Sequence, residues 1–306
     1  MPKLSRSHPL VALILRLSRS PEERAASGLM LVEGIRLARE ALSEAVAIRE
    51  ALVSPRLDLH PQGQDIIAGL TRARVPLHSC DDRLLSSLHH AETHQGVLLL
   101  VERPDLSDAH LTAGAGPRPL VLAAFGVQDP GNLGALIRLA DAAGASSLLA
   151  AGGADPFGPK AVRGSAGSIF RLPVVRARTA SQGVGILDDL RSKGVTIAGA
   201  MPRGGTDYRS ADMSGPMALV LGGEGAGMPP EVEARLDRRL TIPMNPRVES
   251  INVAAAAAVL LFAAAGSGRD RLTIPPARRP PGSSQSPGSA GPPPPLADPP
   301  RRGRRR

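Results

Sequence analysis

Aromatic residues are scarce in this chain of 306 residues: they make up 2% of it, with no Trp and a single Tyr. Hydrophobic residues nevertheless account for 42% of the chain, which is enough for buried cores. We therefore expect those cores to be built from aliphatic side chains, chiefly Leu, Val, Ile and Ala. The length favours two domains plus any disordered part.

Cysteine is represented by Cys80 alone, which excludes an intramolecular disulfide and gives no indication of an oxidising compartment. No apolar run approaches the roughly 18 residues of a membrane span. Residues 10–15 are apolar but are followed by Arg16, and we expect them to be part of a first helix rather than a signal peptide. His and Cys form no cluster with metal-ligand spacing, and the adjacent His89 and His90 are interpreted as surface residues of a helix. The sequence thus predicts a soluble cytoplasmic protein with no membrane segment and no metal site.

The net charge of +9 is distributed unevenly. Residues 1–105 are neutral, residues 106–267 carry +2, and residues 268–306 carry nine Arg against two Asp. The basic excess therefore does not by itself indicate that the folded part binds nucleic acid. Residues 268–306 also hold 11 of the 30 prolines, so we expect a disordered tail. Its arginines either contact RNA phosphates or are simply solvated.

Residues 1–103 show the short, mixed periodicity of a small α/β domain. Residues 1–27 mix Arg, Ser and apolar residues, and we expect them to wrap the surface. Residues 104–118 contain Gly and Pro without sustained periodicity and are interpreted as a linker. In the first domain we expect helices at 33–45, 65–72 and 81–88, and strands at 48–53, 75–77 and 96–101.

Residues 119–267 change to a regular alternation of strands and helices. Continuous apolar strands separated by helices indicate a parallel sheet that is covered on both faces. The expected fold class is therefore α/β. Its strands are expected at 120–125, 147–150, 172–175, 195–198, 217–221 and 239–242, and its helices at 133–143, 160–168, 185–193, 230–236 and 253–265.

The first stretch whose residues could form part of a functional site is residues 128–145, QDPGNLGALIRLADAAGA. An Asp-Pro-Gly turn follows a strand, and Asn132 can cap the helix that comes next. Arg138 falls between apolar neighbours on that helix. Its spacing alone favours a surface Arg whose aliphatic stem lies along apolar residues.

The second stretch, residues 218–229, reads ALVLGGEGAGMP, so that four glycines surround Glu224. Glycines allow positive φ and let a ligand approach the backbone closely. The G-x-G-x-x-G pattern of dinucleotide loops is incomplete, and Pro229 and Pro230 stand where the helix would start. A carboxylate in such a loop suits hydroxyl or amine recognition better than phosphate. The alternative is a tight connection without a ligand.

The third stretch, residues 241–262, reads TIPMNPRVESINVAAAAAVLLF. A short strand leads through a polar turn at residues 245–250 into a helix so rich in Ala and Leu that it must be buried. A polar loop between two apolar elements is a good place for a site. Ser250 and Asn252 stand at the entry to the helix, where simple helix capping is the alternative explanation.

Together, these three stretches resemble the SpoU (TrmH) family of RNA 2'-O-ribose methyltransferases, within the SPOUT class. The resemblance extends to the stretches at residues 160–174, 32–42 and 94–97, and it covers roughly residues 25–265. The matching motifs are N-x-G-x-x-x-R at Asn132, Gly134 and Arg138, L-G-x-E-G-x-G at residues 221–227, I-P-M at residues 242–244, and S-I-N-V at residues 250–253.

The resemblance implies a C-terminal parallel-sheet catalytic domain with a deep trefoil knot, and a small N-terminal α/β substrate-binding domain. The second and third motif loops form the knot, and the last helix is threaded through it. S-adenosylmethionine is bound there in a bent form, and family members are homodimers with the site at the subunit interface. By position, the donor would be held by Gly222, Ile242 and Ile251, with Met244 nearby, and the catalytic set would be Asn132, Arg138, Glu224, Ser250 and Asn252.

Two departures from the family pattern are visible. Leu139 stands where the family often has Thr, and Ala254 stands where it often has Ser. Both lie beside the positions that match. They concern the choice of substrate more than the activity.

The reaction implied is methyl transfer to a ribose hydroxyl, for which the sulfonium donor is already activated and no metal is needed. The family nominates Arg138 to remove the hydroxyl proton, but a neutral guanidinium is costly. We prefer the hypothesis that Arg138 holds a phosphate and stabilises the developing alkoxide while the proton leaves to phosphate, water or Glu224. Ser250 and Asn252 would orient the ribose and the donor, and Glu224 would hold the Asn or the Arg in place.

The expected substrate is structured RNA, ribosomal RNA more than transfer RNA, because relatives without such an N-terminal domain more often act on transfer RNA. The N-terminal domain would select it through shape or phosphate contacts, since it lacks aromatic stacking platforms. The alternatives are the same chemistry on transfer RNA and a non-catalytic RNA-binding relative. A dinucleotide-dependent enzyme is disfavoured by the missing glycine fingerprint.

Overall fold

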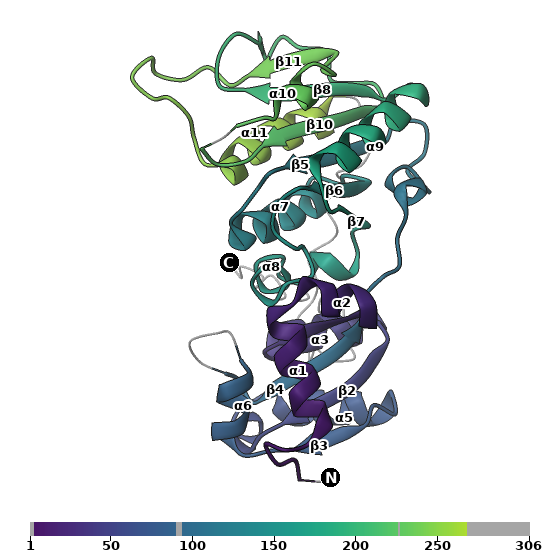
Figure 1. The fold of residues 1–306 in the computed structure, drawn as a ribbon, viewed down its shortest axis with the longest axis vertical. Helices are drawn as coiled ribbons and strands as arrows, with labels where there is room; N and C mark the ends of the chain where they lie inside the picture. Colours follow the sequence, from purple (N-terminus) through teal and green to yellow (C-terminus); the bar gives the residue numbers. More distant parts are fainter. Residues whose placement is uncertain (1–2, 90–93, 226, 268–306) are drawn as a thin grey trace, which may run out of the picture. The chain divides into compact units, whose positions relative to one another are not determined.

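The computed structural model describes residues 3–89, 94–225 and 227–267 (Figure 1). The predicted tail at residues 268–306 lies outside the described residues, as does His90. The described residues belong to one compact unit that contains a four-stranded and a seven-stranded sheet. None of the described helices is long and apolar enough to cross a membrane.

The four-stranded sheet has the order β1-β4-β2-β3, with β4 antiparallel to both of its neighbours and β2 parallel to β3. β4 is an inner strand of this sheet, and its apolar residues Val97 to Val101 are at most 1% exposed. β1 was not predicted, and the helix expected from residue 33 begins at Ile35, because Gly34 with φ +90° ends the strand and precedes the helix. The strands are β1 (Leu29–Glu33), β2 (Ile48–Val53), β3 (Leu77–Ser79) and β4 (Val97–Glu102); the helices are α3 (Ile35–Ser43), α4 (Pro55–Asp58), α5 (Gly63–Arg72) and α6 (Asp82–Leu88).

The first residues of the chain form two helices, α1 (Pro9–Arg19) and α2 (Pro21–Ser27). The prediction that they merely wrap the surface is wrong. Val11, Ile14 and Leu17 are at most 3% exposed and pack with the apolar face of the four-stranded sheet. Their spacing of three residues places them on one side of α1, which makes the apolar run part of a helix, as expected.

The seven-stranded sheet has the order β7-β6-β5-β10-β8-β11-β9, and every pair in it is parallel, as predicted. β10 runs beside β5 in a continuous register, from Met217 opposite Leu120 to Gly222 opposite Phe125. The loops that follow these two strands therefore leave the sheet at the same edge. The strands are β5 (Leu120–Phe125), β6 (Ser147–Ala151), β7 (Val174–Ala177), β8 (Thr196–Met201), β9 (Thr206–Asp207), β10 (Met217–Gly222) and β11 (Arg238–Thr241).

Helices cover both faces of this sheet, as expected (Figure 1). Alternate residues of β5 point to opposite faces, so Leu120 and Leu122 join one apolar cluster while Val121 and Ala123 join the other. The first face packs against α7 (Pro130–Ala142), α8 (Pro159–Gly164) and α11 (Val253–Gly266), and the second against α9 (Ala180–Ser192) and α10 (Pro230–Glu233).

Two connections differ from the prediction. The helix expected at residues 160–168 ends at Gly164, because Ala166 (φ +52°) and Gly167 (φ +101°) turn the chain into the short 3-10 turn η2 (Ser168–Phe170). The expected linker contains a second 3-10 turn, η1 (Asp108–Leu111), whose last residue is fully buried against the sheet. The Ser147 hydroxyl donates a hydrogen bond of 2.7 Å to the carbonyl oxygen of Leu111.

Two buried carboxylates connect the first 33 residues to the second half of the chain. Asp155, in the loop after β6, pairs with Arg24 at 2.7 Å, and both side chains are at most 5% exposed. Glu33 accepts a hydrogen bond of 2.8 Å from Arg163 on α8. The prediction that His89 lies on the surface is wrong. Helix α6 ends at Leu88, and the His89 ring turns inward, where 2% of its side chain is exposed and its Nδ1 lies 3.6 Å from the Glu33 carboxylate.

We expect Asp155→Ala to destabilise the protein by about 3–5 kcal/mol, because it leaves a buried guanidinium without its partner. Arg24 would lose its counter-charge, although its hydrogen bond to the Leu17 carbonyl is kept, and Arg176, 3.5 Å from Asp155, would lose a counter-charge as well. Urea denaturation of the full-length protein measures this change.

The matched control is Asp188→Ala, which removes a pair with Arg235 whose side chains are 49% and 35% exposed. That substitution should change the free energy of unfolding by less than about 1 kcal/mol, since solvent screens exposed pairs. Equal effects of the two substitutions would contradict the role given to Asp155.

Candidate functional site

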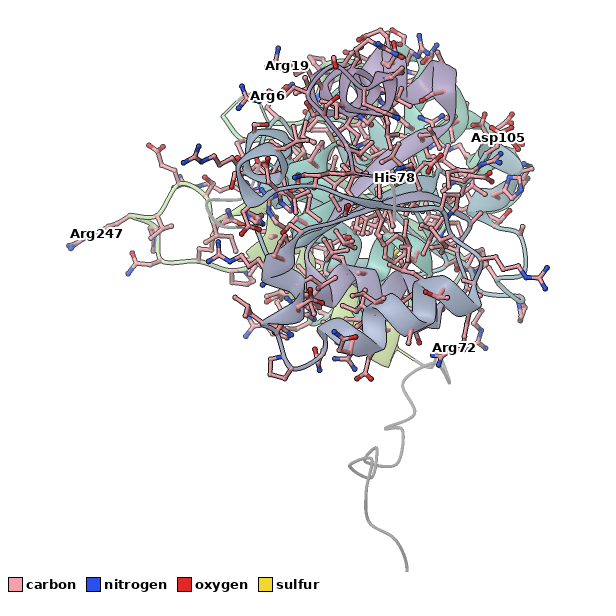
Figure 2. All side chains as sticks on the ribbon, turned by 90° about the horizontal axis from the view of Figure 1, so that it is seen from below. Arg6, Arg19, Arg72, His78, Asp105 and Arg247 are labelled. Atoms are coloured by element: carbon pink, nitrogen blue, oxygen red, sulfur yellow. The ribbon has the colours of Figure 1, made fainter. Side chains whose placement is uncertain are left out.

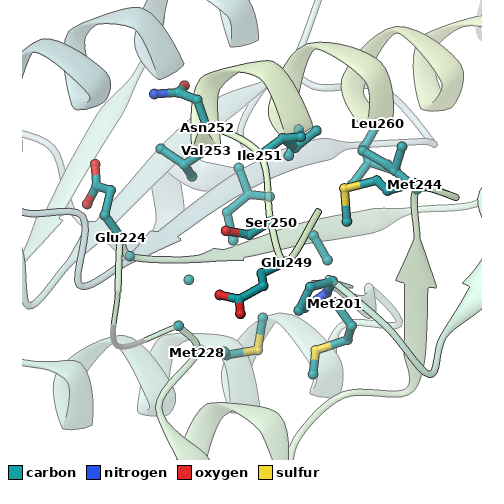
Figure 3. A pocket seen from close by; sticks show the side chains of 18 of the residues that line it. Met201, Glu224, Met228, Met244, Glu249, Ser250, Ile251, Asn252, Val253 and Leu260 are labelled. Carbon is teal, nitrogen blue, oxygen red and sulfur yellow. The ribbon is translucent and has the colours of Figure 1, made fainter. Parts of the chain in front are cut away.

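A pocket of about 560 Å³ lies where the second and third motifs meet (Figure 3). Its walls come from the end of β8, from the loop after β10, and from the segment that joins β11 to α11. They are mainly apolar, with a few polar groups, which is typical of a small-molecule site. The residues that line it are Ala200, Met201, Pro202, Leu221, Gly222, Gly223, Glu224, Gly225, Gly227, Met228, Leu240, Ile242, Met244, Glu249, Ser250, Ile251, Asn252, Val253, Ala256 and Leu260.

Seven of the nine predicted site residues line this pocket. The four assigned to the donor are all present, and so are three of the catalytic set. Asn132 contacts this group from α7, and Arg138 lies elsewhere. The seven that line the pocket are Gly222, Glu224, Ile242, Met244, Ser250, Ile251 and Asn252.

Glycine is required in the loop after β10 because backbone approaches backbone there. A Cβ on Gly223 would lie 2.0 Å from the carbonyl oxygen of Gly126, and one on Gly222 would lie 2.4 Å from the carbonyl carbon of Gly227. Gly223 and Gly227 exchange two backbone hydrogen bonds of 3.1 Å, which close a tight loop around Glu224. The loop thereby fixes a carboxylate at the edge of the pocket.

Glu224 is the first member of a hydrogen-bond relay that joins all three motifs. Its Oε1 accepts from Asn132 Nδ2 at 2.6 Å, and its Oε2 accepts from the backbone N–H of Gln128 at 3.2 Å. Asn132 Oδ1 in turn accepts from Asn252 Nδ2 at 3.2 Å. Asn252 Oδ1 accepts from the backbone N–H of Ala254 at 2.8 Å. Every side chain in the relay is thus oriented by the next.

The capping roles differ from those the sequence suggested. Asp129, not Asn132, caps α7, because its Oδ1 accepts from the Asn132 N–H at 2.9 Å. Asn252, not Ser250, caps α11. Asn132 therefore lies in the first turn of α7 with its side-chain amide free to reach Glu224.

Both carboxylates near the start of α7 are held in the charged form. Burial alone would raise the pKa of Glu224, but hydrogen bonds from Asn132 and from backbone N–H groups lower it below its ordinary value. The pKa of Asp129 is lowered chiefly by the hydrogen bond from Lys160, at 2.8 Å. Glu224 is accordingly a hydrogen-bond acceptor at neutral pH rather than a proton donor.

Arg138 is exposed on α7 and does not line the pocket. It follows Asn132 by six residues, which separates the two by about 9 Å along the helix and places them on different sides of it. Within the part of the chain that the structure describes, its guanidinium has no hydrogen bond or ion pair. The sequence thus predicted a set of five catalytic residues, of which one chain brings four together.

The segment between β11 and α11 projects from the rest of the chain, and Arg247 lies at its tip (Figure 2). Asn245 shapes the tip, since its side chain accepts from the Arg247 N–H at 3.0 Å. Val248 and Ile251 are 42% and 39% exposed, which is unusual for such large apolar residues. The same segment then returns to the pocket through Glu249 and the residues that follow it.

Several residues of the pocket were not predicted as site residues from the sequence. Met201 and Met228 form much of one wall, and Glu249 faces the same space (Figure 3). Met201 ends a strand without any polar motif, so no local signal marked it. Among the described residues, no group of three or more His, Cys, Asp or Glu side chains could hold a metal ion.

Two family sequence models match the chain, and they divide it into the same two parts as the sheets. The SpoU rRNA Methylase family matches residues 119–262, and the RNA 2'-O ribose methyltransferase substrate binding family matches residues 31–107.

Among characterised relatives, the 23S rRNA (guanosine(2553)-2'-O)-methyltransferase RlmP of Bacillus subtilis is 33% identical over 76% of this chain and 87% of its own length. The 23S rRNA (guanosine-2'-O-)-methyltransferase RlmB of Ralstonia nicotianae is 36% identical over 62% of this chain and 77% of its own length.

Solved structures agree with this relationship. The SpoU methyltransferase AviRb from Streptomyces viridochromogenes, in complex with the cofactor AdoMet, superposes with a TM-score of 0.76 at 28% identity, over 84% of this chain and 97% of its own. An AdoMet-bound rRNA methyltransferase from Sinorhizobium meliloti gives a TM-score of 0.73 at 29% identity, over 86% and 97% of the two chains. The chain therefore belongs to the SpoU rRNA methylase family.

Proposed function

We propose that the protein transfers a methyl group from S-adenosylmethionine to a ribose 2'-hydroxyl of structured RNA, with ribosomal RNA as the substrate. The observation that carries this proposal is the relay of Glu224, Asn132 and Asn252 at the edge of a ligand-sized pocket. One member comes from each of the three motifs of the family. The characterised relatives named above act on 23S rRNA, which favours ribosomal over transfer RNA.

The pocket fits the methyl donor in size and in chemistry. At about 560 Å³ it can hold a nucleoside with an amino-acid arm, and the crowded backbone at Gly222 leaves main-chain groups, not side chains, along one wall. Ile242, Met244 and Ile251 offer apolar contacts to the adenosyl part. When bound, the donor supplies a methyl group already activated on a sulfonium. The protein then has to align the acceptor hydroxyl and to manage its proton.

Alignment is the task we assign to the relay. Because both oxygens of Glu224 accept hydrogen bonds, the amide of Asn132 is fixed, and Asn132 fixes that of Asn252. Ser250 and Asn252 would orient the ribose at the mouth of the pocket. Correct alignment of two reactants can lower a barrier by roughly 7–11 kcal/mol.

The proton is the second task. Arg138 carries a permanent charge and is better suited to hold a phosphate and stabilise a developing alkoxide than to act as a base. The lowered pKa of Glu224 makes its carboxylate a weak base, so it is a poor acceptor for that proton. Phosphate or water is therefore the preferred destination.

We also propose that the enzyme is a homodimer with the site at its interface. α11 is apolar on all sides, VAAAAAVLLFAAAG, yet Phe262 is 43% exposed and Ala255 is exposed as well. A helix of this kind is normally covered on every face. A second copy packed on α11 and α7 would cover it and would bring the exposed Arg138 of one subunit to the pocket of the other.

The deep trefoil knot of the family is part of the proposal. The glycine loop after β10 and the segment before α11 line one pocket, and α11 packs on β10 and α7, which supports this part of the proposal. A crystal structure that traces residues 217–267 tests the threading directly.

Three parts of the chain receive a role in this proposal. Residues 1–103 select the RNA, residues 104–118 connect, and residues 119–267 carry the catalytic site; the match of residues 31–107 to a substrate-binding family supports the first of these. Residues 268–306, which are rich in arginine, receive no role in the reaction. The cytoplasmic location remains a prediction.

The function is tested by transfer of labelled methyl from S-adenosylmethionine to ribosomal and transfer RNA pools. We expect alkali-resistant 2'-O-methyl linkages in ribosomal RNA with the wild type and none with Arg138→Ala, because that variant loses the charge that stabilises the alkoxide. Donor affinity, measured by calorimetry, should be the same for both proteins.

A photo-cross-linker in the RNA should attach to residues 1–103.

Label in transfer RNA alone would refute the ribosomal substrate while keeping the chemistry. Intact donor binding without label in either pool would point to a non-catalytic RNA-binding protein. Cross-links restricted to residues 119–267 would refute the role given to the first domain.

The shared site is tested by mixing two inactive variants, Arg138→Ala and Asn132→Ala, through co-expression. If Arg138 serves the partner's pocket, each mixed dimer contains one intact site, and random pairing should restore about a quarter of wild-type activity. Size-exclusion chromatography confirms the dimers.

The matched control pairs Asn132→Ala with Glu224→Ala, two lesions in the same pocket, and it should restore nothing. A mixed dimer of the first pair that stays inactive would show that Arg138 does not act across the interface.

Glu224→Gln should lower kcat by about 5- to 100-fold, the cost of leaving a donor unsatisfied. A glutamine amide can accept from Asn132 Nδ2 or from the Gln128 N–H, but its own N–H₂ then faces the other donor. Donor affinity should change little. Glu231→Gln, an exposed carboxylate on α10 outside the relay, is the control.

The pH dependence has a definite sign. The pKa of Glu224 is lowered in the folded protein from its ordinary value of 4.5. Its carboxylate is therefore charged above pH 4.5, and the charge is lost only as the pH falls below that value. The wild-type rate should therefore show no acid limb from Glu224 between pH 5 and 9. An inflection there that disappears in Glu224→Gln would show that Glu224 exchanges a proton during the reaction.

A further inference from the structure

The pocket contains two carboxylates whose surroundings differ. Glu224 is engaged through both of its oxygens by Asn132 and Gln128. Glu249 has no hydrogen bond or ion pair with any residue that the structure describes, although it lines the pocket. Figure 3 shows its carboxylate directed toward the middle of the pocket, between Ser250 and Met228. Glu249 is therefore free to meet a ligand, whereas Glu224 is committed to the relay.

The charge of the pocket has one sign. None of the described residues of this chain that line it is Lys, Arg or His, so within one chain Glu224 and Glu249 have no cation beside them in the wall. Much of the remaining surface is apolar, with Met201, Met228 and Leu260 among its residues. Glu249 is exposed in this structure, and a ligand that fills the pocket would displace water from its carboxylate and strengthen the interaction with a charge on that ligand. Such a pocket favours a cation over a neutral molecule of the same shape.

The two forms of the cofactor differ in this property. S-adenosylmethionine carries a sulfonium, an ammonium and a carboxylate, and so has a net charge of one positive unit. Loss of the methyl group turns the sulfonium into a neutral thioether, and S-adenosylhomocysteine has no net charge. The ribose, the adenine and the amino-acid arm are the same in both.

We propose that Glu249 selects the cationic methyl donor over its neutral product. The inference rests on the proposed function, since it assigns a further residue to the same pocket. Glu249 attracts the donor through the sulfonium charge, and this attraction ends when the methyl group leaves. The product lacks this attraction, which favours its exchange for a new donor.

The test is Glu249→Gln, which keeps the shape of the side chain and removes its charge. Calorimetry on the full-length protein without RNA gives the Kd of S-adenosylmethionine, S-adenosylhomocysteine and sinefungin, an analogue whose amine keeps the positive charge near the position of the sulfonium. We expect the two cationic ligands to bind about three- to tenfold more weakly and the neutral product to be unaffected, as removal of one partly screened charge interaction predicts.

Glu231→Gln is the matched control: it removes an exposed carboxylate from the neighbouring α10, outside the pocket, and should leave all three affinities unchanged. Thermal unfolding of each variant checks that the fold is intact. A rise in salt concentration should weaken S-adenosylmethionine binding more in the wild type than in Glu249→Gln.

Equal weakening of all three ligands would overturn the inference, because Glu249 would then hold a group they share, such as the ribose hydroxyls. Unchanged affinities would overturn it as well. A wild-type protein that binds none of the ligands would refute the proposed function itself. Normal binding by the wild type, with an unaltered ratio in Glu249→Gln, would refute the role of Glu249 alone.

Discussion

The parallel pairing of β5 with β10 is the constraint on which the site depends. Their register runs without a break from Leu120 opposite Met217 to Phe125 opposite Gly222. Parallel strands end at the same edge, so two loops that are 97 residues apart in the chain, following Phe125 and Gly222, leave the sheet side by side. Gly223 completes the approach, because any side chain there would collide with the carbonyl oxygen of Gly126. Glu224 is carried to Asn132 by this pairing rather than by any local preference.

Much of the fold was accessible from the sequence because apolar patterning determines it. The strands of the large sheet are continuous apolar runs, and the helices between them have apolar sides that fit opposite faces of the sheet. The same reasoning predicted a helix at residues 10–15 but not that Val11, Ile14 and Leu17 are buried, because residues 12, 13 and 15 between them are apolar as well and obscure the spacing of three. Apolar patterning also failed to predict β1, because the apolar residues of β1 run directly into those of the helix that follows Gly34.

The site was predictable as a set of residues but not as a network. Motif resemblance nominated Glu224, Asn132 and Asn252 and left open whether Glu224 holds the Asn or the Arg, but it did not indicate that Asn132 bonds in turn to Asn252. For Asn132 local rules even suggested a different role, since an Asn at the start of a helix ordinarily caps it. Asp129 takes over the cap of α7, which releases the Asn132 side chain for a partner 92 residues away. Helix-capping rules consider only residues close in sequence, so they cannot predict that Asn132 bonds to a residue after a distant strand.

Four of the five catalytic candidates meet within one chain, and the fifth does not. Arg138 points to solvent from the same helix that supplies Asn132, and six residues of helix keep the two apart. Exposed on the same part of the molecule is a helix, α11, that is apolar on every side and packs against α7. Exposure of the apolar side of α11 to water is unfavourable. The charge of Arg138 cannot act on a reaction from a position outside the pocket. Both features are explained at once if a second copy covers them, because the contact that buries Phe262 also delivers Arg138 to a pocket that otherwise lacks a cation.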